Sequence, residues 1–348
     1  MREAGRRLKA KAQALWCKGG LEGSFEAIWL QGAILLAAAG LDFGLGDPWS
    51  WPHPVQAMGK VISAYSKLIL RLPLARWAMR MGGVGLGCLL IGGSALLSGY
   101  GLWALGLISP WLQTGVAVVL LASCFAGRSL RLAAEGVLEP LAKENLPQAR
   151  SRLAMIVGRD TEQLTAEEIR RAVLETVSEN AIDGALAPLF YAVMGAWLGW
   201  AVPLAIAYKA ASTLDSMVGY REAPYTDLGW FSARVEDGLT WLPCRLSVVT
   251  IALLSGRPRR VLHQCWRDAR ADPSPNAGWS ECAYAAALGV QLGGPNIYRG
   301  QLKVKPLLGE ANRPITDEVI KAAFGLTRLS FLVGLTVGAV GLAVIGLC

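Results

Sequence analysis

The sequence predicts an all-α integral membrane protein that crosses the bilayer several times. Of its 348 residues, 53% are hydrophobic and only 17% are charged, whereas soluble domains carry about 25% charged residues. The mean hydropathy is +0.38, and the 40 glycines and 13 tryptophans are typical of membrane helices with aromatic anchors at the interfaces. We expect about four to six membrane segments, some short or re-entrant, joined by cytoplasmic helical loops.

A basic N-terminal extension, residues 1–25, precedes the first apolar run. That run, Ala27–Leu41, is short for a membrane span, which needs about 20 residues, so we expect an anchor or a re-entrant helix. No small-residue cleavage site follows the run, which argues against a signal peptide. The next segment, Val55–Met81, has an apolar face and a basic face, and it predicts an amphipathic helix on the anionic cytoplasmic surface or against the protein core.

A membrane hairpin is predicted from two uncharged segments, Gly82–Ile108 and Trp111–Phe125, which Ser109 and Pro110 join. Basic residues flank the hairpin on both sides, so both of its ends are expected to face the cytoplasm. The chain then becomes more polar. A helix is expected over Glu135–Arg152, and a second helix should begin at Thr165, because Glu168 three residues later completes a capping box.

The apolar run Gly184–Tyr208 is interrupted by two prolines and two glycines. If it crossed the membrane once, Lys209 and Asp215 would lie on the side opposite Glu175 and Asp183. If it forms a broken or re-entrant pair of short helices, these residues can meet. Proline and glycine interruptions favour the broken pair.

The last part of the chain alternates apolar runs with a basic loop. Arg245–Ser255 is apolar but too short to span the bilayer alone. Residues 256–323 carry many arginines and lysines and should form a cytoplasmic loop. Within it, Asp272–Glu281 and Leu292–Gly300 are expected to be Pro/Gly/Asn loops on either side of a small apolar helix. Residues 324–348 form the final predicted span.

Several classes of function find no support in the sequence. The net charge of +8 comes from basic loops and not from a basic tract with interleaved aromatic residues, which argues against nucleic-acid binding. The seven cysteines show no CxxC spacing, and with only His53 and His263 a zinc or haem site or a histidine-based triad has little support. The nucleotide motif GxxxxGK[ST] is absent.

The stretch from Arg159 to Asp237 carries the candidate chemistry, because carboxylates, amides and a lysine stand there beside strongly apolar runs. Polar groups are costly against lipid and usually line a protein cavity or a water-facing site. Such a set suits phosphate and Mg²⁺ chemistry. Simpler interpretations are a solvated helix face around Glu175, a turn at Asp183 and Gly184, and a lysine at position 209 that reaches the membrane interface.

Six segments resemble, in order, the signatures of the CbiB/CobD family of adenosylcobinamide-phosphate synthases: LDFGLGDPWSWPHPVQAMGK, GRDT, ETVSENAIDGALAPLFYA, AYKAASTLDSMVGY, DLGWFSARVED and PSPNAGWSECAYAAALGVQLGGPNIY. The resemblance runs from about Leu41 to about Tyr298, so we expect residues 26–348 to form one domain, with the extension 1–25 outside it. Two positions depart from the family pattern, since Ser212 and Thr240 stand where asparagines are expected.

The resemblance implies a ligase in the inner membrane with its active site on the cytoplasmic side. It would join a carboxylate of adenosylcobyric acid to (R)-1-amino-2-propanol O-phosphate, or a similar amino alcohol phosphate, with hydrolysis of ATP. A carboxylate is a poor acylating agent, so an acyl phosphate formed with ATP and Mg²⁺ is expected, followed by displacement by the amine.

The resemblance also implies roles for individual residues. The expected catalytic residues are Asp183, Lys209, Asp215 and Asn180. The expected Mg²⁺ ligands are Glu175, Glu179, Asp183 and Asp215. The expected substrate-binding residues are Arg159, Asp160, Tyr191, Asp47, His53, Asn276, Asn296 and Arg234.

The implied partners are the corrinoid, the amino alcohol phosphate and membrane lipid, together with a second copy of the chain or other corrinoid-pathway enzymes. Two alternatives stay open. One is a non-enzymatic signalling protein similar to AmpE, and the other is a corrinoid-binding transporter, because charged residues beside broken helices also mark transport sites. Binding of ATP or of a corrinoid would distinguish these classes.

Overall fold

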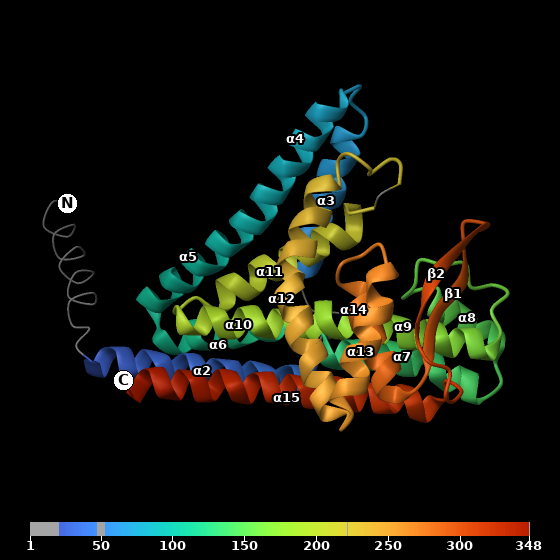
Figure 1. Cartoon of the computed structure of the whole chain (residues 1–348). Helices are drawn as coiled ribbons and strands as arrows, with labels where there is room; N and C mark the ends of the chain where they lie inside the picture. The colour runs from blue at the N-terminus through green and yellow to red at the C-terminus, as the bar shows by residue number, and fades with distance from the viewer. Residues whose placement is uncertain (1–20, 47–52, 221, 348) are drawn as a thin grey trace, which may run out of the picture.

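The computed structural model describes residues 21–46, 53–220 and 222–347 (Figure 1). The described residues are 75% helical with little strand, which confirms the predicted all-α polytopic membrane fold. Within the described residues, four stretches are long and apolar enough, by length and composition, to cross a membrane. They are Arg76–Ile108, Pro110–Ala142, Trp230–Leu254 and Asp317–Val344.

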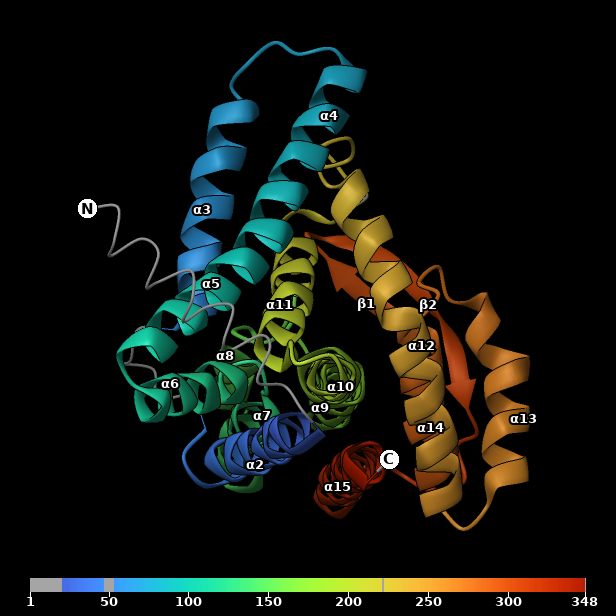
Figure 2. The same ribbon diagram turned by 90° about the vertical axis from the view of Figure 1, so that its left-hand side faces the viewer.

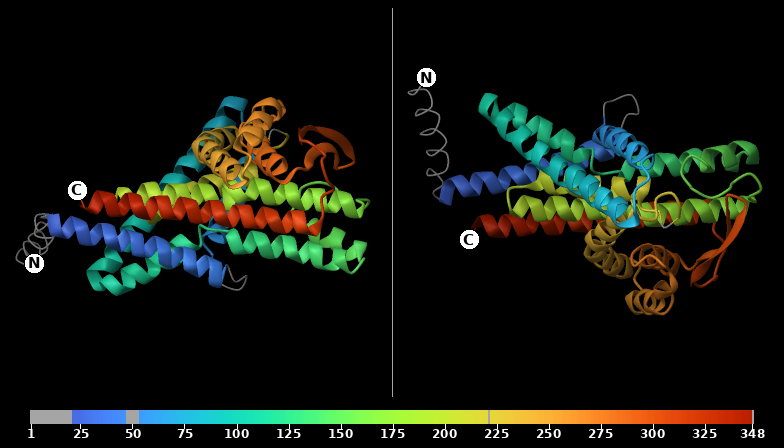
Figure 3. Two further views of the ribbon diagram at one scale, coloured as in Figure 1. Left: turned by 60° about the horizontal axis from the view of Figure 1, so that its bottom comes forward. Right: turned by 90° about the horizontal axis from the view of Figure 1, so that it is seen from above.

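A bundle of aligned helices forms the body of the molecule. Helices α2 (Leu21–Gly44), α6 (Pro110–Ala122), α10 (Ala187–Trp197) and α15 (Asp317–Leu347) run alongside one another (Figures 1 and 3). The first apolar run, Ala27–Leu41, therefore belongs to a longer helix than predicted. Residues 324–347 of the final predicted span lie within α15, and Cys348 is outside the described residues.

The predicted amphipathic helix over Val55–Met81 is wrong as a single element. It forms α3 (Pro54–Ile69) and α4 (Arg76–Gly87), and the chain leaves the helical conformation between them where Pro73 lacks a backbone donor. The predicted membrane hairpin is confirmed. Its first arm continues from α4 through η1 (Cys88–Gly92) and α5 (Gly93–Ile108), and the Ser109 hydroxyl caps α6 by accepting the Leu112 N–H at 3.4 Å.

The helix expected over Glu135–Arg152 is two helices, α7 (Gly127–Ala142) and α8 (Leu146–Leu153). The predicted capping box begins α9 (Ala166–Ala181). Its two bonds run from the Thr165 N–H to the Glu168 carboxylate, at 2.8 Å, and from the Glu168 N–H to the Thr165 hydroxyl, at 3.3 Å. Helix α9 therefore starts where the sequence indicated.

The broken helix pair is also confirmed. Helix α9 continues through a π-helical turn, η2 (Ile182–Leu186), into α10, and the chain then turns back into α11 (Ala201–Val218). The turn is so tight that a Cβ at Gly195 would lie 2.5 Å from the Trp200 carbonyl oxygen, and only glycine fits there. The reversal returns α11 past η2.

The region after α11 differs most from the prediction. The expected short apolar run is part of a 25-residue helix, α12 (Trp230–Leu254), followed by α13 (Pro258–Asp268) and η3 (Ala269–Ala271). The small apolar helix is confirmed as α14 (Ala277–Leu288). The expected loop Leu292–Gly300 is instead part of a β-hairpin, in which β1 (Gln291–Tyr298) pairs antiparallel with β2 (Gln301–Gly309).

The described residues pack around two hydrophobic cores. One, the hairpin core, takes its buried residues from α7–α9, α12–α14, both strands and the first part of α15. The other, the bundle core, takes them from α2, α3, α6, α10, α11 and the later part of α15. The turn η2 lies where the chain passes from the hairpin core to the bundle core.

Candidate active site

Asp183 lies in η2, at the junction of the two cores. A π-helical turn inserts an extra residue into the helix and changes its hydrogen bonding, and such turns are frequent at functional sites. Here the Gly184 carbonyl accepts the Ala126 N–H at 2.9 Å, which ties η2 to the segment before α7. The position of Asp183 is therefore fixed by the backbone of two separate segments.

Four charged side chains from three helices lie within electrostatic range of Asp183. Its carboxylate interacts electrostatically with Glu179, Lys209, Asp215 and Glu236. Glu179 precedes it on α9, Lys209 and Asp215 lie on α11, and Glu236 lies on α12. Helices α10, α11 and α12 are neighbours in the middle of the molecule (Figure 2). The structure thus brings together three of the four predicted catalytic residues.

A hydrogen-bonded aromatic pair borders this acidic cluster. The rings of Tyr191 and Tyr208 stack with centroids 5.0 Å apart. The Tyr208 hydroxyl lies 2.8 Å from the Thr240 hydroxyl, which donates in turn to the Glu236 carboxylate. The Tyr191 hydroxyl donates to the Leu239 carbonyl at 2.8 Å. Thr240, one of the two departures from the family pattern, therefore orients Glu236 in this chain.

Carboxylates outnumber cations in the cluster around Asp183. Asp215 Oδ1 is buried and has no hydrogen-bond partner among the described residues. Within the same residues, no three His, Cys, Asp or Glu side chains lie close enough to hold a metal ion by themselves. In phosphate sites Mg²⁺ is usually held by one or two carboxylates and by substrate phosphates, and Asp183 with Asp215 fits that arrangement.

Glu175 belongs to a different network from Asp183. Its carboxylate accepts from the Arg159 guanidinium and, at 2.9 Å, from the Gly293 N–H. The Asn296 side-chain oxygen accepts from Arg159 at 2.5 Å and from Arg171 at 3.3 Å. Glu175, Arg159 and Asn296 are 2%, 8% and 3% exposed, so the network is buried between α9 and β1. These three predicted site residues join the hairpin to α9.

The other predicted substrate-binding residues are scattered. Asp160 accepts the Arg299 and Gly300 N–H groups at 3.0 and 2.7 Å and so supports the turn of the β-hairpin. His53 caps α3 by accepting the Val55 N–H at 3.2 Å.

Asn276 is buried near the cluster. Its side chain donates to the Asp237 carbonyl at 2.9 Å and accepts from Arg245 at 3.0 Å. Arg234 is exposed on α12, and Asp47 lies outside the described residues.

Three charged residues of the site were missed by the sequence analysis, namely Glu236 of the acidic cluster, Glu281 and Lys305. Glu281 on α14 is fully buried, and one of its carboxylate oxygens accepts from the Lys305 ammonium on β2 at 3.1 Å. Burial raises the pKa of Glu281 to about 8, and the nearby Glu179 and Glu175 carboxylates raise it too, against the effect of Lys305. Glu281 stood inside an expected loop and Lys305 among many basic residues, so neither had a distinguishing signal.

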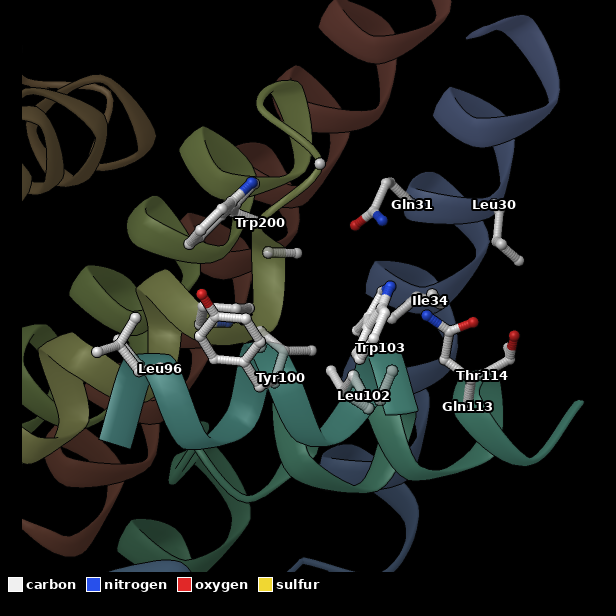
Figure 4. Close-up of a pocket in the computed structure, with 17 residues that line it drawn as sticks. Leu30, Gln31, Ile34, Leu96, Tyr100, Leu102, Trp103, Gln113, Thr114 and Trp200 are labelled. Atoms are coloured by element: carbon white, nitrogen blue, oxygen red, sulfur yellow. The ribbon is translucent and has the colours of Figure 1, made fainter. Parts of the chain in front are cut away.

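Two cavities in the described residues have no residue of the acidic cluster in their linings. One, of 520 Å³, lies between α2, α5, α6 and the turn from α10 to α11 (Figure 4). Its lining is mainly apolar and aromatic, with Tyr100, Trp103 and Trp200 among its walls, and contains none of the predicted site residues. A smaller cavity of 230 Å³ is bordered by Asn180, which is exposed and donates to the Thr176 carbonyl at 2.9 Å.

Comparison with known proteins identifies the relatives of the chain. Its residues 35–327 match the CobD/Cbib protein family. The chain is 51% identical over 307 residues to the cobalamin biosynthesis protein CobD of Synechocystis sp., across 88% of this chain and 90% of that protein. It is 43% identical over 291 residues to the cobalamin biosynthesis protein CbiB of Salmonella arizonae, across 82% and 89% of the two chains.

A third relative is the cobalamin biosynthesis protein CobD of Yersinia enterocolitica, which is 42% identical over 299 residues, across 85% of this chain and 92% of that protein. No solved structure matches the chain. The family match covers the segment that contains η2, the acidic cluster and the β-hairpin. On these grounds the chain belongs to the CobD/CbiB family.

Proposed function

We propose that this protein acts in cobalamin biosynthesis as an ATP-dependent ligase. It joins a carboxylate of adenosylcobyric acid to the amine of (R)-1-amino-2-propanol O-phosphate, or of a similar amino alcohol phosphate, and forms adenosylcobinamide phosphate. Its relatives are named for cobalamin biosynthesis. The observation that carries the specific reaction is the cluster of Asp183, Asp215 and Lys209 at the junction of the two cores.

The reaction requires the carboxylate to be activated before the amine attacks. The substrate carboxylate attacks the γ-phosphorus of ATP, ADP leaves, and an acyl phosphate forms. The amine then attacks the acyl carbon, the amide bond forms, and inorganic phosphate and a proton are released. Holding both substrates in reactive geometry supplies much of the acceleration in such reactions.

The residues of the cluster have separate roles in this proposal. Asp183 and Asp215 hold Mg²⁺, which neutralises phosphate charge when it is bound. Lys209 contacts phosphate oxygens with its ammonium group. Asn276 orients a substrate amide or carboxylate beside Asp237, whose carbonyl oxygen already fixes the amide group of Asn276. Arg159 and Glu175 position β1 beside α9 and do not contact the reacting groups.

We place the protein in the inner membrane with this site on the cytoplasmic side. The basic residues of 256–323 support that orientation, because cytoplasmic loops carry an excess of Lys and Arg. Membrane lipid surrounds the bundle core, and a second copy of the chain or other enzymes of the corrinoid pathway are the proposed protein partners.

The test uses purified protein in detergent with adenosylcobyric acid, aminopropanol phosphate and MgATP. Formation of adenosylcobinamide phosphate that requires all three supports the ligase. Corrinoid binding without product contradicts the ligase and favours a transporter. If the folded protein binds neither corrinoid nor ATP, the result contradicts the ligase and the transporter and favours a signalling protein.

Two substitutions test the cluster directly. Asp215→Asn and Lys209→Met should each lower the rate of ligation by at least about 100-fold, because each removes a charge that stabilises the transition state. Glu139→Gln, which changes an exposed ion pair with Lys143, is the matched control and should keep the wild-type rate. Ligation by either cluster variant at the wild-type rate would remove that residue from the mechanism.

A further inference from the structure

Helix α12 meets the length and composition of a membrane span, but it does not run with the bundle. It crosses α15. In Figure 1, α15 lies lengthwise and α12 stands upright. In Figure 2, α15 is seen end-on, whereas α12 is seen along its length. If α15 crosses the bilayer along with its neighbours α2 and α10, α12 lies closer to the plane of the membrane than to its normal.

The buried apolar residues of α12 belong to the hairpin core only. Cys244, Val248 and Ile251 are grouped there with residues of α13, α14 and the strands. They are grouped also with Val319, Ile320 and Ala323 at the start of α15. The buried residues from the later part of α15, Leu335 and Leu342, belong to the bundle core, to which the described residues of α12 contribute nothing.

The charge pattern of α15 indicates at which level of the bilayer α12 crosses this helix. Arg328 is the last charged residue of α15, and the remainder of the helix, Leu329–Leu347, is uncharged. At 1.5 Å per residue that remainder is about 30 Å long, which matches the hydrocarbon core of a bilayer. The buried residues that α15 contributes to the hairpin core precede Arg328, and Phe331, the partly buried residue of α15 that packs on this core after Arg328, lies only three residues beyond it. We therefore place the crossing of α12 at the membrane surface.

The opposite side of α12 presents an apolar stripe. Leu242, Leu246, Val249 and Leu253 follow one another at spacings of four, three and four residues, which places them on one helical face. They are 46%, 48%, 44% and 63% exposed. No described residue covers them enough to bury them, so their environment is supplied by something outside the described residues.

Aromatic and basic groups border this stripe. The Arg245 guanidinium lies 5.2 Å from the ring of Trp241 and 4.5 Å from that of Trp279. The chain that follows α12 adds Arg257 and Arg259, both exposed. Tryptophan and arginine beside an apolar stripe are the composition of helices that lie in a bilayer interface, with the cations at anionic headgroups.

We propose that α12 is an interfacial helix and not a membrane span. It lies in the cytoplasmic surface of the bilayer, with the stripe Leu242–Leu253 among the acyl chains and the adjoining arginines at anionic phospholipid headgroups. The two site-bearing residues of α12, Glu236 and Thr240, are buried on its protein-facing side. The bilayer surface therefore supports the outer side of α12, the helix that carries Glu236 and Thr240.

The sidedness of the two ends of α12 tests this proposal. Single cysteines at Thr226 and Arg257, in a variant that lacks the native cysteines and keeps the wild-type unfolding temperature, are labelled with an impermeant maleimide in inverted and right-side-out vesicles. Glu139→Cys and Leu198→Cys mark the two sides of the membrane. Labelling of both ends from the side of Glu139→Cys supports an interfacial helix. Labelling from opposite sides overturns it.

Spin labels at Leu246 and Val249 then identify what covers the stripe, in nanodiscs of phosphatidylglycerol and phosphatidylethanolamine. Lipid contact predicts a high collision rate with oxygen and a low one with a water-soluble nickel chelate. Replacing phosphatidylglycerol with phosphatidylcholine should make both labels more accessible to the nickel chelate. Shielding from both reagents would mean that a second copy or a protein partner covers the stripe, and strong contact with nickel would mean water. Either result overturns the proposal.

Discussion

Two acidic residues predicted as metal ligands, Glu175 and Asp215, differ in what their carboxylates contact. Glu175 is 2% exposed and accepts from the Arg159 guanidinium and the Gly293 N–H, whereas Asp215 Oδ1 has no partner among the described residues. A buried carboxylate that is already paired in this way stabilises the fold and has no free oxygen for a ligand. An unpaired buried oxygen is instead available to a cation or a donor brought by a ligand.

This difference predicts opposite phenotypes for the two amide substitutions. Glu175→Gln leaves the Arg159 charge buried without its partner and should lower the free energy of unfolding by about 3–5 kcal/mol. Asp215→Asn should unfold like the wild type while losing ligation. Unfolding in a denaturing detergent titration measures the first quantity and product formation the second. A stable but inactive Glu175→Gln variant would contradict this and mean that Glu175 takes part in the reaction.

Glu281 predicts a pH dependence of stability. Burial, with the Glu179 and Glu175 carboxylates, raises the pKa of Glu281 from 4.5 to about 8 in the folded protein. Between these values the folded state holds a proton that the unfolded state releases, so the stability that Glu281 contributes is fully present below about pH 4.5 and is lost as the pH rises toward 8. The Glu281→Gln variant should show a shallower fall in unfolding temperature over that window. A slope equal to that of the wild type would contradict the assignment, and Glu139→Gln serves as the control.

The sequence predicted that Asp183, Lys209 and Asp215 could meet through a broken helix pair, but it did not predict the separate network around Glu175. Asp183, Lys209 and Asp215 were predictable because charge inside an apolar pattern is rare and informative. The pairing of Arg159 with Glu175 and Asn296 depends on a contact between α9 and β1, which lie more than a hundred residues apart in the chain. Local patterns carry no information about such a contact.

At the scale of elements, the turn between α10 and α11 decides whether the cluster forms. A Cβ at Gly195 would lie 2.5 Å from the Trp200 carbonyl oxygen and 2.8 Å from the Ala201 Cα. Gly195→Ala should therefore force the two helices apart, lower stability by about 1–3 kcal/mol and reduce ligation. Gly136→Ala in α7, where a Cβ meets nothing within 4 Å, should be neutral or stabilising by up to about 1 kcal/mol. Equal behaviour of the two variants in unfolding and activity assays would contradict this role of the turn.

The β-hairpin shows why one element was mispredicted. Its first strand contains Gly293, Gly294 and Pro295, residues that normally predict a loop. The glycines have φ of +85° and +89° beside a register shift between the strands, and a Cβ at Gly293 would lie 1.9 Å from the Pro306 carbonyl oxygen. Glycine there permits close approach of two backbones and presents the Gly293 N–H to Glu175.

At the scale of the whole molecule, the site depends on both cores. Glu179 lies on α9 and Glu236 on α12, elements whose buried residues contribute to the hairpin core, whereas Lys209 and Asp215 lie on α11 within the bundle core. The sequence predicted a membrane bundle and a cytoplasmic part from hydropathy and basic loops. That the chemistry lies at their junction follows from packing, because the broken pair α10–α11 returns toward η2.

A site shared by two cores predicts that ligand binding orders both of them together. Adenosylcobyric acid with Mg²⁺ and a non-hydrolysable ATP analogue should slow amide hydrogen exchange in η2, in the segment of α11 around Asp215 and in the segment of α12 around Glu236. Binding to the native state removes local openings that expose these amides. The helices around the 520 Å³ cavity, α2, α5 and α6, should exchange as they do without ligand and so provide the internal control. Protection confined to that cavity would contradict the proposed site, because the substrates would then bind in the bundle core away from every charged residue of the cluster.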